Sequence, residues 1–156
     1  MSALADIRKA VFAEFEAALA AAPNYSAIAI DAPNRRFQKP LNDPWVRVAL
    51  NPGTRAPAAL GSSGQKLNRF PFILALQVFV PENNGEKIAF EIADELLGPL
   101  EYQTAIGTVD GTRHNIHFET ASIGTGFRAA SDSDEGAASF WQLNATISGI
   151  ANDWPA

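Results

Sequence analysis

The chain contains two histidines, His114 and His117, and these are the residues with the clearest potential for chemistry. A histidine can bind a metal ion or act as a general acid or base near neutral pH. The residues around this pair have the pattern of a β-strand, on which positions three apart point to opposite faces. The two side chains cannot bind one ion together on an unbroken strand, so we expect no metal site here.

Three other segments resemble ligand-binding loops in composition but not in spacing. The segment 61–66 lacks the spacing of a phosphate-binding loop, with Leu67 where a hydroxyl is needed. Gly124-Thr-Gly126 lacks the third glycine of a dinucleotide fingerprint, since Ala129 stands there. In the acidic segment 132–136 glycine arrives one residue too early for a calcium loop. No serine has a recognisable catalytic setting. We therefore expect no catalytic residue, no bound metal and no cofactor. We also expect that the protein is not an enzyme.

The length and composition fit one domain without disulfide bonds. A chain of 156 residues can bury a sizeable core, and it contains no cysteine. The N-terminal residues mix charged with apolar side chains, and no apolar run approaches the roughly 18 residues that cross a bilayer. We expect neither a signal peptide nor a membrane anchor, and folding in a reducing cytoplasm.

The net charge of −5 is unevenly distributed. Residues 1–70 hold nine Lys and Arg against five Asp and Glu, whereas residues 71–156 hold three against twelve, giving +4 and −9. An ordinary solvated surface explains this split, and so do two unlike faces that meet different partners.

The longest apolar stretch, residues 70–80, predicts a strand that is apolar on both faces. Such a strand is a central core strand, or it has one face in a subunit interface. An amphipathic helix follows and ends at Gly98-Pro99.

The remaining elements come from periodicity and turn signals. Spacings of three and four predict an amphipathic helix over residues 3–21, and Asp110-Gly111 marks a hairpin. The predicted strands lie at Ser26–Ile30, Trp45–Leu50, Tyr102–Val109, His114–Ala121 and Trp141–Ser148. Together these elements predict an α+β fold, an antiparallel sheet of about four to six strands with two helices packed on one face.

We expect a single domain over residues 1–156 with long, mobile loops at 51–69 and 125–137. The first of these is rich in Gly, Ser and Pro and carries Arg55, Lys66 and Arg69. A loop of this length is either a disordered arm or a segment that orders against a partner. The basic residues match no known nucleic-acid-binding motif. Any contact with nucleic acid would therefore be with the phosphate backbone and independent of base sequence.

The order of these elements resembles the tail terminator, or tail completion, proteins of long-tailed bacteriophages, a lambda-like minor tail protein family. The resemblance covers nearly the whole chain. Its strongest segments are Trp45–Leu50 with Asn51-Pro52-Gly53, then Leu60-Gly61, Leu74–Pro81 and Gly85–Leu97.

This resemblance implies a structural virion protein at the head-proximal end of the tail, assembled in the host cytoplasm. It implies a homo-oligomer, a six-membered ring on the last ring of the tail tube, which stops polymerisation and joins the tail to the head connector while DNA passes through the hole. We predict that Trp45, Arg47 and Phe79 lie at inter-subunit or tube contacts. The basic residues Arg55, Lys66 and Arg69 would line an interface or the DNA conduit.

Two alternatives remain open at this point. Another ring protein of the same particle, a tail tube or head-to-tail completion protein, shares the small α+β architecture. A small cytoplasmic enzyme would use His114 or His117 as a general base.

Overall fold

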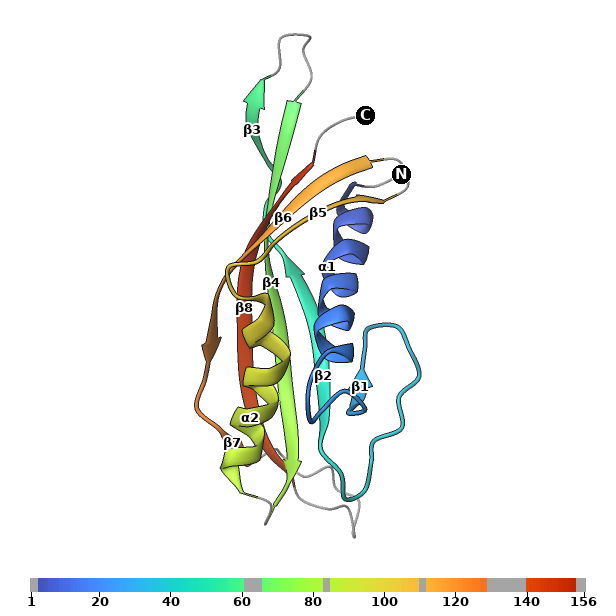
Figure 1. Cartoon of the computed structure of the whole chain (residues 1–156), viewed down its shortest axis with the longest axis vertical. Helices are drawn as coiled ribbons and strands as arrows, with labels where there is room; N and C mark the ends of the chain where they lie inside the picture. Colours follow the sequence, from blue (N-terminus) through green and yellow to red (C-terminus); the bar gives the residue numbers. More distant parts are fainter. Residues whose placement is uncertain (1–2, 61–65, 83–84, 110–111, 129–139, 154–156) are drawn as a thin grey trace.

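A computed structural model describes residues 3–60, 66–82, 85–109, 112–128 and 140–153 (Figure 1). Its elements form a curled, mostly antiparallel sheet with two α-helices, so the α+β prediction is confirmed. The helices are α1 (Ala3–Ala20) and α2 (Glu86–Leu97), followed by the 3₁₀ turn η1 (Gly98–Leu100). The strands are β1 (Ala29–Asp31), β2 (Trp45–Pro52), β3 (Ala56–Leu60), β4 (Lys66–Pro81), β5 (Thr104–Val109), β6 (Thr112–Ile123), β7 (Phe127–Arg128) and β8 (Phe140–Asp153).

The sheet is ordered β1-β2-β4-β8-β6-β5, with β3 added to β4 and β7 to β8. In the described part of the chain only β1 and β2 pair in parallel. The longest ladder joins β4 to β8 over fourteen rows, from Asn68 opposite Asp153 to Pro81 opposite Phe140. β4 and β8 are therefore the centre of the sheet.

The hydrophobic core lies between the helices and one face of the sheet, called the core face below. α1 contributes Val11 and Phe15, and α2 contributes Ile92 and Leu96, all fully buried. The strand residues of this core recur at every second position, as the pleat requires. They include Val46, Val48, Leu74, Leu76, Val78, Ile116, Phe118, Leu143 and Ile147. Both helices thus pack on the same face, as the sequence predicted (Figure 1).

The opposite face of the sheet, called the helix-free face below, alternates with the core face along each strand. It includes Ile73, Gln77 and Phe79 of β4, and neither helix covers it. Ile73 is 45% exposed, whereas Phe79 is 7% exposed because aromatic side chains of the same chain cover it. The strand that looks apolar on both faces therefore has a helical cover on one face only.

The structure differs from the sequence prediction most in residues 51–69, expected as a long loop. β3 pairs with the first residues of β4 from Ala56 opposite Arg69 to Leu60 opposite Lys66, so residues 56–60 and 66–69 form two paired strands, called the hairpin below. The hairpin projects past the helices at the upper end of the molecule (Figure 1). Pro57 is tolerated because β3 pairs on one side only in the described residues, where a missing backbone donor costs little.

Smaller differences concern strand ends. β1 lies at Ala29–Asp31, later than the predicted 26–30, and β8 runs past Ser148 to Asp153. In the second predicted loop, 125–137, Phe127 and Arg128 form β7, and residues 129–137 lie outside the described part of the chain. β5 and β6 form the predicted antiparallel hairpin, with Val109 opposite Thr112.

Candidate functional site

The histidine positions lie on one continuous strand, as predicted. β6 runs without interruption through both, and His117 is exposed with its Nδ1 3.0 Å from Thr104 Oγ1. The side chain of His114 lies outside the described part of the chain. Among the described residues, no three His, Asp or Glu side chains group closely enough to hold a metal ion.

Two of the predicted interface residues, Trp45 and Phe79, form an aromatic cluster at one end of the helix-free face. They are direct cross-strand neighbours, and their rings stack with centroids 4.0 Å apart and planes 7° apart. Phe140 meets the Trp45 ring edge-on, with ring centroids 6.3 Å apart. The ring centroid of Phe37, in the segment between β1 and β2, lies 5.1 Å from that of Trp45. Trp45 is only 4% exposed, so the ring that the sequence places at an inter-subunit or tube contact is buried by its own chain.

Arg47, the third predicted interface residue, lies at the surface of this cluster. Its Nε donates to Asp31 Oδ2 at 2.8 Å, across the parallel β1–β2 pair. Its guanidinium carbon lies 5.4 Å from the Trp45 ring and 5.7 Å from the Phe79 ring, within cation–π range. The structure therefore brings Trp45, Arg47 and Phe79 together, and Arg47 is the exposed member of the three.

The predicted basic group does not form one patch. Arg55 lies just before β3, with its guanidinium carbon 5.4 Å from the ring of Phe70, a residue of the core face. Arg69 directly precedes Phe70 on β4, so it points to the helix-free face, where its Nε donates to Asn152 Oδ1 at 3.4 Å. Lys66 begins β4, and its side chain lies outside the described part. Arg55 and Arg69 are thus near each other at the base of the hairpin but on different faces.

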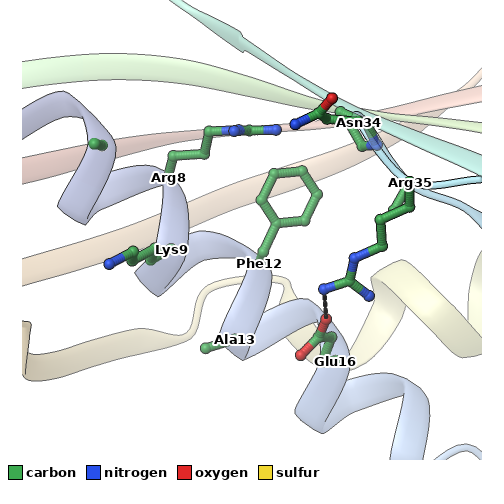
Figure 2. A pocket seen from close by; sticks show the side chains of 10 residues that line it. Arg8, Lys9, Phe12, Ala13, Glu16, Asn34 and Arg35 are labelled. Carbon is green, nitrogen blue, oxygen red and sulfur yellow. Dashed lines mark ion pairs between the residues drawn. The ribbon is translucent and has the colours of Figure 1, made fainter.

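A groove of about 490 Å³ runs between α1 and the turn Ala32–Arg35 (Figure 2). The turn is closed by a bond from Arg35 N to Ala32 O at 3.3 Å, with Pro33 at its second position and Asn34 at its third with φ 61°. This is the pattern of a type II turn, which favours asparagine or glycine at the third position. The turn therefore holds Asn34 and Arg35 over α1.

Two cations flank an aromatic ring in this groove. The ring of Phe12 lies between the side chains of Arg8 and Arg35 (Figure 2). The Arg8 guanidinium carbon is 5.4 Å from the centre of that ring. Arg35 Nη2 is 4.0 Å from Glu16 Oε1, and both side chains are largely exposed, so this ion pair is weak. No sequence-based prediction included this groove, although Pro33-Asn34 and the four-residue spacing of Arg8, Phe12 and Glu16 were signals for it.

The segment after α1 is tied to α2 by polar contacts. Asn24 donates through its backbone N and its Nδ2 to the carboxylate of Glu95, and the Tyr25 hydroxyl donates to Glu91 Oε2 at 3.3 Å. Partial burial raises the pKa of the Tyr25 phenol, and the negative charge of Glu91 raises it further. These contacts fix the outer surface of α2 relative to α1.

The protein is of the α+β class, with both helices on one face of a curled, mostly antiparallel sheet. A family model described as phage tail terminator protein matches residues 6–143. The chain therefore belongs to the phage tail terminator family, a family of structural, non-enzymatic virion proteins. It is a component of the phage tail.

Comparison with solved structures supports the fold. One of the similar structures superposes with a TM-score of 0.56 at 17% sequence identity, covering 100% of this chain and 98% of the other, and its name describes no function. At that identity the likeness shows the fold alone. No curated protein matches the sequence. Among the described residues, no helix is both long and apolar enough to cross a membrane.

Proposed function

We propose that this protein forms a ring that caps the phage tail tube, terminates tube polymerisation and joins the tail to the head connector. The observation that carries the proposal is the family match across residues 6–143. The ring would be a hexamer at the head-proximal end of the tail, assembled in the host cytoplasm. DNA would pass through its hole without sequence-specific contact.

The architecture suits this role because a terminator must present unlike surfaces. One surface binds the last ring of the tube, and the other must offer no equivalent place for a further tube subunit. A closed ring also needs heterologous contacts, in which two different patches of each copy meet. The two faces of the sheet differ, since α1 and α2 cover one face and leave the other without helices, and this difference supports the proposal of two unlike surfaces.

We propose that Arg47, supported by Trp45 and Phe79, belongs to an inter-subunit or tube contact. The two buried rings hold the guanidinium at the surface of the helix-free face, and Asp31 fixes its direction. A positioned arginine beside aromatic rings is a common anchor in protein interfaces. Arg55, Lys66 and Arg69 would meet a partner or the DNA phosphates from the hairpin.

The decisive experiment is electron microscopy of particles from a phage in which this gene alone is deleted. Termination predicts overlong tubes without heads. Normal tails on filled heads would overturn the proposed function.

The same particles test the contact surface through complementation with variants. Arg47→Glu should fail to restore normal tail length, because it reverses the charge that the contact needs. Arg36→Glu, an equal charge change at an exposed position in the segment between β1 and β2, is the matched control and should restore it. Full complementation by Arg47→Glu would remove this surface from the proposal.

A further inference from the structure

The groove between α1 and the Ala32–Arg35 turn has the chemistry of a receptor for an acidic helix. Phe12, Ala13 and Pro33 give it an apolar lining, and Arg8, Lys9 and Arg35 line it with positive charge. Glu16 is the one acid among its lining residues, and its pair with Arg35 is long and exposed. An incoming carboxylate can therefore replace Glu16 at little cost.

The outer surface of α2 carries the complementary pattern. Glu86, Phe90 and Asp94 recur at every fourth position and are all exposed, so they form one stripe along the helix. Phe90 is 38% exposed, so part of its ring is accessible to a partner. The two acids lie about 12 Å apart along the helix axis, at 1.5 Å per residue. The stripe is an aromatic ring with an acid on either side.

We propose that the groove of one copy receives the Glu86–Phe90–Asp94 stripe of the next copy. Phe90 would lie on the apolar lining beside Phe12, while the two carboxylates would meet Arg8 and Arg35. An arginine binds a carboxylate through two parallel hydrogen bonds where the geometry allows. The proposal names the subunit contact of the ring, and it rests on the proposed function only for the claim that copies form a ring at all.

The positions of the two surfaces give this contact its directionality. The groove lies on α1 and the stripe lies on α2, so a copy that offers its stripe to one neighbour keeps its groove free for another. This is a heterologous contact, which generates a closed ring when the rotation per copy closes and a filament when it does not. The +4 and −9 charges of the two halves of the chain favour the same pairing.

The test is a charge-exchange experiment on the purified full chain, followed by sedimentation velocity at low salt. Arg8→Glu/Arg35→Glu and Glu86→Arg/Asp94→Arg should each weaken self-association by about tenfold or more, since each puts like charges in contact. A mixture of the two variants should recover assembly, because each variant then meets opposite charge at both of its contacts. Arg36→Glu, next to Arg35 but outside the groove, is the control and should assemble as the unaltered chain does.

Phe90→Ala gives an independent test without a change of charge. It should weaken association while leaving the circular dichroism spectrum and the unfolding transition nearly unchanged, since Phe90 contributes little to the core of its own chain. This separates loss of contact from loss of fold.

Three outcomes would overturn the proposal. The first is an unaltered chain that stays monomeric up to about millimolar concentration, well above the range of a specific interface. The second is assembly of both double variants as the unaltered chain does. The third is normal rings from Arg8→Glu/Arg35→Glu that no longer cap tubes, which would assign the groove to the tube protein. If the charge exchange succeeds while the gene deletion leaves tails normal, the docking stands and the proposed function fails.

Discussion

The two faces of β4 differ although the strand looks apolar on both. On the core face Leu74, Leu76 and Val78 are fully buried beneath α1 and α2. On the helix-free face burial changes along the strand, from Ile73, which is half exposed, to Phe79, which is buried in the aromatic cluster. An apolar strand therefore does not require a second layer of helices. A few aromatic side chains cover one end of the face, and the other end stays open.

The largest expected effect is on the core face. Leu76→Ala removes a fully buried side chain and should lower the free energy of unfolding by about 2–5 kcal/mol. Ile73→Ala, three positions earlier on the helix-free face, should cost about 1 kcal/mol or less because the side chain already meets solvent. Chemical denaturation measures both. Equal losses would mean that the two faces contribute alike to stability.

The aromatic cluster should behave as a second, smaller core. Phe79→Ala should lower the free energy of unfolding by about 3 kcal/mol, because it removes a ring that stacks on Trp45. A double-mutant cycle with Trp45→Ala should give a coupling of about 0.5–1.5 kcal/mol. Additive losses in that cycle would show that the two rings stabilise the fold independently.

Gly149 of β8 tests how tightly the core face is filled. A Cβ at this position would contact the ring of Phe72 and would come within 2.8 Å of the backbone oxygen of His117, which cannot move without disturbing β6. Gly149→Ala should therefore cost about 1–3 kcal/mol through overpacking. The control is Ser148→Ala on the opposite face, which loses a bond to Glu119 at an exposed site. A neutral Gly149→Ala would show that the core face has room to adjust.

The smallest expected effect concerns Tyr25, which follows α1 and donates a hydrogen bond to Glu91 of α2. Because the pKa of the Tyr25 phenol is raised in the folded chain, the unfolded chain loses this proton first as the pH rises above about 10. The folded state then loses the stability linked to this group as the pH rises through its folded pKa. Tyr25→Phe should flatten this part of the pH–stability profile, with Tyr102→Phe as the control for loss of a phenol. Superimposable profiles for Tyr25→Phe and the unaltered chain would show that the Tyr25 phenol does not contribute to this part of the profile.

Much of the fold follows from the sequence, because the spacing of apolar residues indicates which face of a helix or strand is buried. The spacings over residues 3–21 and 86–97, and the alternation over 45–50 and 141–148, identify both helices and the strands β2 and β8 correctly. The hairpin of β3 with β4 was hidden, because Ala-Pro-Ala-Ala-Leu has no alternation of its own and is ordered by pairing with β4.

The candidate surfaces follow from the sequence only in part. Cross-strand pairing of Trp45 with Phe79 depends on the register between β2 and β4, which strand patterns alone do not fix. The groove depends on a turn that packs on α1 from twenty residues farther along the chain. Such neighbours are set by tertiary packing, so no local pattern reports them.

The long β4–β8 ladder has a consequence for synthesis on the ribosome. β8 separates β4 from β6, and its first residue, Phe140, follows the end of β4 at Pro81 by 59 positions. Until residues 140–153 leave the exit tunnel, β4 has β2 and β3 on one edge and nothing on the other. One backbone edge of this apolar strand therefore stays unpaired for several seconds, since ribosomes add about 5–20 residues per second. This chain should therefore depend on chaperones during its synthesis more than its small size suggests.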